Sequence, residues 1–498
     1  MHQEGWADLY SWEVERSSET PLFRQLYLQL RRAILAQELR PGAKVPSTRA
    51  LAARLGISRA SVISAYEQLL AEGYLAGKSG SGTYISADLP EPTDAGAPHR
   101  RRRPGQAGPR IATAEAETFI RSLQQSDERP FTTGRSLVDA RTVEAWRRLS
   151  NRTFRSLDPV HLGYTDPRGL LDLRVMISEY LRAARAVRSA AEQILVTSGT
   201  QHAIDIAIRV LLRPGDEVWV EDPGYGVTSA ALLAAKVALQ PIPVDAQGLD
   251  VRAGIAAAPR ARAVFVTPSH QFPLGVVLST ARRLELLAWA RDARAWIIED
   301  DYQSEFRYAG RPLASLQGLD EADRVIYVGT LNKALFPGLR IGYAVVPPAL
   351  LREFVTTRLL MDRQPPSLVQ AVVAAFMREG HLSAHIRRMR LAYREQRDVL
   401  ARELARRAGA VIAVEAAEQG MHLVAYLTDG RSDVALESAA HQAGLIVKAI
   451  SPLYRKAEPR SGLLLGFSGF PPQRIIPAAA RLARVIDEGA GRGTRQSR

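Results

Sequence analysis

The chain has 498 residues, of which 46% are apolar and 24% charged, so it can form two or three domains with at least one large core. It contains no cysteine, which excludes disulfides and thiolate metal sites and fits a cytoplasmic protein. No apolar run reaches membrane-spanning length and no secretion signal opens the chain, so we expect no membrane partner. The net charge of +14 suggests a polyanionic partner, but sixty arginines against six lysines also fit a GC-rich genome, so the charge alone identifies none.

Three helices and a hairpin are predicted in the first 86 residues. Apolar residues at helical spacing place the first helix at 21–37. Ser47 and Ser58 are expected to cap two further helices, which end near residues 56 and 72. Residues 73–85 contain two short β-prone runs around a Gly/Ser/Lys tip, as in a β-hairpin wing.

The second and third helices have the spacing of a helix-turn-helix. Ala52, Gly56 and Val62 supply the small residue, the turn glycine and the buried branched residue of that motif. A helix-turn-helix presents the start of its second helix to base edges in the major groove, and Arg59 lies at that start. A small helical domain without a nucleic-acid role is the alternative.

Residues 20–86 resemble the winged helix-turn-helix of the GntR family. The resemblance rests on PLFRQLYLQLRRAIL, LRPGAKVPSTRALAARLGISRASVISAYEQLLAEGYL and SGSGTYI. It implies double-stranded operator DNA as a partner. The positions that match the family's DNA contacts are Arg49, Ser58, Arg59, Ser61, Gly80 and Gly82.

Residues 87–114 are rich in Pro, Gly, Ala and charge and show no apolar periodicity, so we expect a flexible linker. A run of four arginines at 100–103 is interpreted as part of a solvated tether. The alternative is extra contact with DNA phosphates, which would steepen the salt dependence of binding.

From residue 115 to about 490, strand-like runs alternate with helical ones, which predicts a mostly parallel α/β sheet. Five such runs each end in a polar cluster, at the edge of the sheet where open α/β folds bind ligands. The runs are 194–197, 217–220, 263–266, 295–298 and 325–328.

The clusters together describe pyridoxal 5′-phosphate (PLP), although each side chain taken alone has an ordinary structural explanation. The SGTQ segment at 198–201, with Thr200 and Gln201, opens a helix whose free N–H groups suit a phosphate. Arg340 and Thr330 add a cation and a hydroxyl there. A lysine imine and an acidic partner for the ring nitrogen are the marks of this cofactor. The remaining candidates are Lys333 for the imine, Asp300 for the ring nitrogen, Tyr302 for the phenolic oxygen and Tyr225 for the ring face.

Residues 115–490 resemble a fold-type-I aminotransferase, and the whole chain resembles the MocR subfamily of GntR regulators. The matching stretches are LGYTDPRGLLDLR, VTSGTQHAIDIA, VWVEDPGYG, VTPSHQFPLG, IIEDDYQSEFRY and YVGTLNKALFPGLRIGYAVVP. The resemblance implies a Schiff base between Lys333 and PLP, with phosphate contacts from Thr200, Gln201, Thr330 and Arg340. It also implies a head-to-tail homodimer in which Tyr164 reaches the neighbouring subunit's phosphate.

The sequence departs from working aminotransferases at the substrate side. The arginine that forks onto the substrate's α-carboxylate is replaced by Leu464, and a second arginine found in some amino-acid sensors is replaced by Val227. Asn332 stands before the lysine where the family more often has serine. His270 or Gln271 is expected on the phenolate side, where the family's Asn-Pro motif is altered.

These observations favour a cytoplasmic bacterial transcription regulator, nucleoid-associated when bound to DNA, that senses PLP, an amine or an amino acid through imine chemistry at Lys333. An active aminotransferase with a DNA-binding appendage is the alternative. A repressor whose second domain is only a dimerisation scaffold is the third interpretation. Activator and repressor cannot be distinguished from fold analogy.

Overall fold

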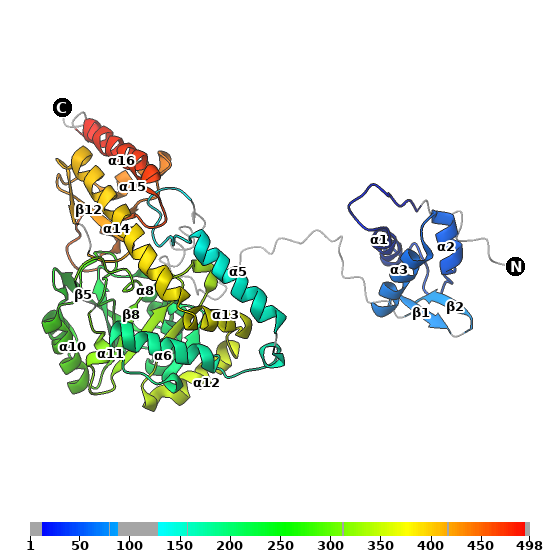
Figure 1. Ribbon diagram of the computed structural model, residues 1–498, viewed down its shortest axis with the longest axis horizontal. Helices are drawn as coiled ribbons and strands as arrows, with labels where there is room; N and C mark the ends of the chain where they lie inside the picture. The colour runs from blue at the N-terminus through cyan, green and yellow to red at the C-terminus, as the bar shows by residue number, and fades with distance from the viewer. Residues whose placement is uncertain are drawn as a thin grey trace. The chain divides into compact units, whose positions relative to one another are not determined.

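The computed structural model describes residues 12–493 apart from 79, 88–127, 157, 311–312 and 416–417 (Figure 1). The chain divides into two compact units, Met1–Gly108 and Pro109–Arg498, and each is described by itself. The predicted linker at 87–114 lies, but for Ala87, outside the described residues. In the part of the chain that the structure describes, no helix is long and apolar enough to cross a membrane.

The first unit is a three-helix bundle followed by a hairpin. Its core combines apolar residues from all five elements, among them Leu30, Val62 and Ile85, none more than 1% exposed. The two hairpin strands pair in antiparallel register from Leu75 opposite Ile85 to Lys78 opposite Gly82. The elements are α1 (Leu22–Leu35), α2 (Thr48–Leu55), α3 (Arg59–Ala71), β1 (Leu75–Lys78) and β2 (Gly82–Ile85).

The helix-turn-helix prediction is confirmed at each of its signals. The Ser47 hydroxyl accepts a hydrogen bond from the Ala50 N–H at the start of α2, and α2 ends at Gly56 with a φ of 63°. Left-handed backbone of this kind favours glycine, which explains the turn residue. Ser58 caps α3 in the same way, by accepting from the Ser61 N–H.

The second unit contains an eight-stranded sheet in the order β3-β10-β9-β8-β7-β4-β5-β6. β10 is antiparallel to both of its neighbours, whereas β9, β8, β7, β4 and β5 are parallel. The strands are β3 (Ile194–Thr197), β4 (Glu217–Asp222), β5 (Ala238–Asp245), β6 (Gly248–Leu249), β7 (Ala263–Val266), β8 (Trp296–Asp301), β9 (Val325–Thr330) and β10 (Gly342–Val345).

Helices cover both faces of this large sheet, so its central strands are apolar on both sides, as parallel strands require. The helices of this part are α5 (Ala140–Arg155), α6 (Leu171–Arg185), α7 (Thr200–Leu211), α8 (Gly226–Ala234), α9 (Val251–Ala257), α10 (Thr280–Asp292), α11 (Leu316–Leu319), α12 (Leu351–Asp362) and α13 (Ser367–Arg378).

A smaller, antiparallel sheet follows, in the order β11-β12-β14-β13. One of its faces packs on the long helix α14 and on α15 and α16, which Figure 1 shows beside it. The elements are α14 (His381–Ala408), β11 (Ile412–Glu415), β12 (His422–Leu427), α15 (Asp433–Gln442), β13 (Lys448–Ala449), β14 (Gly462–Gly466) and α16 (Pro472–Gly493). The predicted class, a winged helix-turn-helix joined to an α/β aminotransferase-like domain, is confirmed.

Candidate functional site

The Lys333 loop between β9 and β10 is held by bonds within itself. The Thr330 hydroxyl donates to the Ile341 carbonyl at 3.2 Å and accepts from the Asn332 N–H at 3.1 Å. The Asn332 side-chain oxygen accepts from the Ile341 N–H at 2.8 Å. Asn332 therefore closes the loop, a role that the sequence did not predict for it.

The Lys333 amine lies in a largely buried position against the loop of residues 131–137. Its Nζ donates to the Gly134 carbonyl at 3.3 Å, and Ser136 donates to the Lys333 carbonyl at 3.1 Å. A Cβ added at Gly134 would lie 2.4 Å from Nζ, so a larger residue there would displace the amine. Burial lowers the pKa of Lys333, which favours the neutral, nucleophilic amine.

Asp300, near the end of β8, and Tyr225 line one cavity together with Glu221, Thr228 and Thr267. The residue Asp300 retains some exposure, but its Oδ1 is buried and accepts no hydrogen bond. Burial, with the nearby Asp301 and Glu221 carboxyls, raises the pKa of Asp300 to about 7. A carboxyl in this state is well suited to a cationic or N–H partner from a ligand.

Two further polar groups of the site are buried without partners. The Tyr302 hydroxyl and the Gln201 side-chain oxygen make no hydrogen bond with the described residues. Buried polar groups are almost always paired, so these orphans, with the Asp300 Oδ1, mark places for ligand atoms. Their chemistry fits PLP: an acceptor for the ring nitrogen, a donor for the phenolate and a helix N-terminus for the phosphate.

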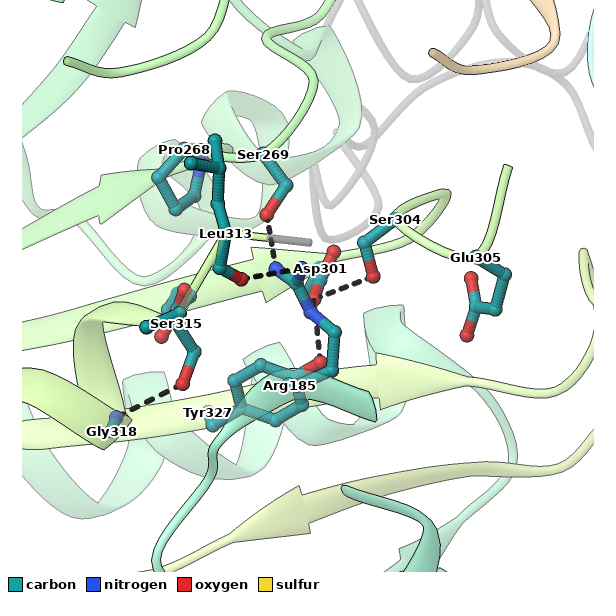
Figure 2. A network of polar contacts seen from close by, with 12 residues as sticks. Arg185, Pro268, Ser269, Asp301, Ser304, Glu305, Leu313, Ser315, Gly318 and Tyr327 are labelled. Atoms are coloured by element: carbon teal, nitrogen blue, oxygen red, sulfur yellow. Dashed lines mark hydrogen bonds and ion pairs between the residues drawn. The ribbon is translucent and has the colours of Figure 1, made fainter. Parts of the chain in front are cut away.

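A buried network around Asp301 fixes the end of β8 (Figure 2). The Arg185 guanidinium donates to the Asp301 carboxylate at 2.8 Å and to the Ser269 hydroxyl at 2.5 Å. The same Asp301 oxygen accepts from Tyr327 at 2.6 Å and from Ser304 at 2.8 Å. Ser269 precedes His270, so one guanidinium holds two of the loops that carry predicted site residues.

The start of α7 lies beside the lysine loop, as the phosphate prediction requires. Gly199, with a φ of 117°, precedes the first helical residue, Thr200. A Cβ at Gly199 would lie 3.2 Å from the Asn332 side-chain nitrogen and 3.7 Å from the Arg340 guanidinium, so only glycine leaves this corner open. Arg340 is exposed and adopts a left-handed φ of 54°.

Tyr164 lies apart from the other predicted cofactor residues. Its side chain is 77% exposed, and the Arg363 guanidinium stacks 3.6 Å from its ring centroid. Among the described residues, no contact brings it to Lys333 or Arg340. This placement suits a residue that acts toward another subunit, which is taken up below.

The carboxylate-clamp position is filled by a small apolar cluster. Leu464 of β14 is fully buried with Val424, Tyr426 and Ile450. Phe272 and Leu274, from the loop after β7, pack against this cluster. Val227, the second clamp position, lies in the first turn of α8, next to Tyr225.

Two histidines enter the site from different sheets. His270 is 1% exposed, and neither of its ring nitrogens has a hydrogen-bond partner among the described residues. Gln271, by contrast, uses its side chain to donate to the Pro223 and Phe272 carbonyls and to accept from the Leu274 N–H. His422 of β12 lies 4.7 Å from His270, ring to ring. Burial lowers the pKa of His422 to about 4, and the nearby Lys333 charge adds to the effect. Sequence reasoning missed His422 and Gly134, because neither belongs to a polar cluster at a strand end.

Most of the predicted DNA contacts are exposed in the first unit, and Ser61 is half-buried. Arg49, Ser58 and Arg59 are exposed, and Arg59 donates to Thr48 at 3.3 Å across the helix-turn-helix. Ser61 pairs its hydroxyl with that of Ser58 at 2.9 Å. On the wing, Gly80 and Gly82 have φ values of 72° and 117°, and Lys78 lies over the Tyr84 ring. Ser79 lies outside the described residues.

Both units match known families. Residues 22–85 match the family described as bacterial regulatory proteins, gntR family, and residues 130–461 match aminotransferase class I and II. The second unit is similar to a Pyrococcus horikoshii kynurenine aminotransferase solved with PMP, with 26% identity and a TM-score of 0.69 over 76% of this chain and 95% of that one.

Two regulators are similar over nearly their whole length. The pyridoxine biosynthesis transcriptional regulator PdxR of Corynebacterium glutamicum is 31% identical over 94% of this chain and 97% of its own. The probable rhizopine catabolism regulatory protein MocR of Rhizobium meliloti is 38% identical over 93% of each chain. With both domain families present in the same order, the chain belongs to the MocR subfamily of GntR-type transcription regulators, in which a DNA-binding winged helix-turn-helix is joined to an aminotransferase-like domain.

Proposed function

We propose that this regulator holds PLP on Lys333 and uses the site as a receptor for PLP itself or for an amine, not as an enzyme. The observation that carries the proposal is the contrast around Lys333. Cofactor-facing groups such as Asp300 and Tyr302 are buried and unpaired, whereas the substrate-clamp position, Leu464, is closed by apolar packing.

When bound, PLP supplies an aldehyde that condenses with primary amines and a ring that absorbs visible light. The Lys333 amine, whose pKa is lowered by burial, is the nucleophile for that aldehyde. Asp300 holds the ring nitrogen, Tyr302 donates to the phenolic oxygen and Tyr225 covers the ring. Thr200, Gln201, Thr330 and Arg340 surround the phosphate at the start of α7.

The apolar cluster at Leu464 argues against transaminase activity on ordinary α-amino acids. Catalysis depends on holding the substrate in a reactive geometry, and a forked arginine supplies that geometry for a carboxylate. Without it, an amine can reach Lys333 but its acid group is not fixed. PLP, or an amine without an α-carboxylate, therefore suits the site best. The names of two relatives, a pyridoxine regulator and a rhizopine regulator, agree with this class.

The DNA-binding part is proposed at residues 17–86 and the effector part at 115–490, in a cytoplasmic homodimer with a head-to-tail arrangement. The exposed Tyr164 supports the dimer, because it lies on the surface with Arg363 stacked on its ring, where a partner subunit's phosphate site could meet it. Operator DNA would contact Arg49, Ser58, Arg59, Ser61 and the wing glycines Gly80 and Gly82.

The cofactor half of the proposal is tested by visible absorption. We expect purified protein to be yellow and Lys333→Ala to lack the lysine-dependent band while remaining folded. Titration with a panel of amines and amino acids should then identify the compounds that remove the band. A wild-type protein without the band, or a K333A variant that keeps it, would contradict the proposal.

The DNA half is tested with fragments from upstream of the protein's own gene. Arg59→Ala should weaken binding by about 1–3 kcal/mol and reduce the salt dependence by about one charge. Arg155→Ala, an exposed arginine of α5, is the matched control and should change neither quantity. Equal losses in the two variants would show that general charge, not the helix-turn-helix, binds DNA.

An active aminotransferase is the second candidate, since Lys333, Asp300 and Tyr302 are all present. Sustained turnover of a common amino acid with a 2-oxo acid, lost in K333A, would establish it. The closed cluster at Leu464 leads us to expect none.

A further inference from the structure

The large and small sheets of the effector unit meet at two kinds of contact. One is a backbone joint, in which the Tyr308 N–H donates to the Glu418 carbonyl and the Gly420 N–H to the Phe306 carbonyl, each at 2.9 Å. The other is made by side chains, among which Asp222, at the end of β4, holds a run of backbone amides of the small-sheet part. A side-chain contact of this kind can open without breaking any backbone pairing.

The Asp222 carboxylate receives three successive backbone N–H groups from the small-sheet part. Arg455 donates to Oδ1 at 2.7 Å, and Lys456 and Ala457 donate to Oδ2 at 2.8 and 2.7 Å. Successive N–H groups that converge in this way form an anion-binding nest, and hydrogen bonds to a carboxylate are stronger than neutral ones. Asp222 is only 1% exposed, so water does not replace the bonds.

The same carboxylate is three residues from the ring-covering Tyr225. The turn between them is held from the large-sheet side by Gln271, which donates to the Pro223 carbonyl at 2.8 Å. Tyr225 packs edge-on against Phe272 at 5.3 Å, and Phe272 packs against His422 of the small sheet at 5.8 Å. A planar ligand against Tyr225 therefore fixes the turn that positions Asp222.

We propose that Asp222 is the positioning residue through which occupancy of the cofactor site is transmitted to the small-sheet part, by holding the amides of residues 455–457. The inference rests on the proposed function, since it needs a ring bound against Tyr225. In this proposal, one carboxylate provides the coupling between the ligand site and the small-sheet part that a sensor requires.

The chain contains a matched control for this role. Asp433 also accepts backbone N–H groups from the same segment, from Ser451 at 2.8 Å and from Ile450 and Gly462 at 3.1 Å. It lies on α15, within the small-sheet part, so it stabilises the segment without linking it to Tyr225. Asp222→Asn and Asp433→Asn each replace one oxygen of a carboxylate that accepts hydrogen bonds from this loop, and each removes the negative charge.

The experiment uses the full-length protein with PLP as the probe. Hydrogen exchange of the 455–457 amides and the operator Kd are measured with and without PLP. In the wild type, PLP should slow exchange and shift the Kd, each on the order of tenfold. Asp222→Asn should still bind PLP, with its visible band, but both shifts should fall below about twofold. In Asp433→Asn, the 455–457 amides should exchange faster both with and without PLP, yet PLP should still slow their exchange and shift the operator Kd as in the wild type.

If Asp222→Asn keeps shifts as large as the wild type, the role of Asp222 is wrong while the proposed function stands. If the wild type itself shows no PLP-dependent change in Kd, the proposed function fails and the inference fails with it. Should D222N not fold, Asp222→Ser, which removes the charge with a smaller side chain, provides the same comparison.

Discussion

Two groups of residues in the effector unit, named the large-sheet wall and the small-sheet wall, follow opposite rules. The large-sheet wall, formed by Tyr225, Asp300, Tyr302 and Lys333, includes two buried polar groups, the Asp300 Oδ1 and the Tyr302 hydroxyl, that have no hydrogen-bond partner among the described residues, an arrangement that costs stability and suits a ligand. The small-sheet wall, formed by Val424, Tyr426 and Leu464, is a satisfied apolar surface like any core. On the proposed function, cofactor binding and substrate chemistry are therefore separate in this protein, because the large-sheet wall offers groups for PLP while the small-sheet wall has no group for a substrate carboxylate.

The largest expected effect comes from the small-sheet wall. Leu464→Ala removes a fully buried side chain and should lower the free energy of unfolding by about 2–5 kcal/mol. PLP affinity should change by less than about threefold, because the cluster is connected to the proposed ring-covering residue Tyr225 through an intervening side chain, Phe272. Urea unfolding and absorbance titration measure the two quantities. A large loss of PLP affinity at unchanged stability would mean that Leu464 belongs to the binding site.

The large-sheet wall should respond in the reverse way. Asp300→Asn replaces the charged partner of the ring nitrogen and should weaken PLP binding by about a hundredfold, since a hydrogen bond to a charged group contributes about 1.5–3 kcal/mol. Stability without PLP should be equal or higher, because a buried, unpaired carboxyl is removed. Asp205→Asn, on the exposed surface of α7, is the control. Loss of stability in D300N would contradict the comparison.

The pH dependence of stability isolates the same carboxyl. Burial raises the pKa of Asp300 to about 7 in the fold, against an ordinary value of 3.8, so the folded protein binds a proton that the unfolded chain has released. Stability conferred by that proton is lost as the pH rises from about 4 to about 7. The advantage of D300N over wild type, without PLP, should therefore grow by about 4 kcal/mol across this range and then stay constant, since each pKa unit corresponds to about 1.4 kcal/mol. Urea unfolding of both proteins at a series of pH values measures it, and an advantage that falls with pH would contradict the assignment.

Much of the large sheet could be predicted from the sequence. β3 and β7 have the predicted bounds, because parallel strands buried on both faces are continuous apolar runs. β8 was predicted to end at residue 298 but continues to Asp301, since its last residues are acidic yet still pair with β9. The onset of polar residues therefore placed the end of β8 too early.

The small-sheet side of the site could not be predicted. Gly134 contacts Lys333, and His422 contacts His270, only because segments far apart in sequence pack together, and neither residue has a local pattern that indicates a ligand site. The same holds for Asp222, whose polar cluster was recognised although its bonds to residues 455–457 depend on the docking of the small sheet. Local motifs indicate which strand ends bind a ligand, and tertiary packing decides what faces them.

The smallest expected effect concerns Asn332, which lies between the two walls. Its side-chain oxygen accepts from the Ile341 N–H at 2.8 Å, a bond that the shorter serine side chain cannot reach without moving the loop. Asn332→Ser should therefore lower the free energy of unfolding by about 1 kcal/mol, the net value of one buried hydrogen bond. PLP affinity should fall only slightly, because the cofactor residues of the loop, Thr330 and Lys333, keep their own contacts. A loss as large as that of D300N would mean that Asn332 contacts PLP directly, and would move it from the support of the loop to the large-sheet wall.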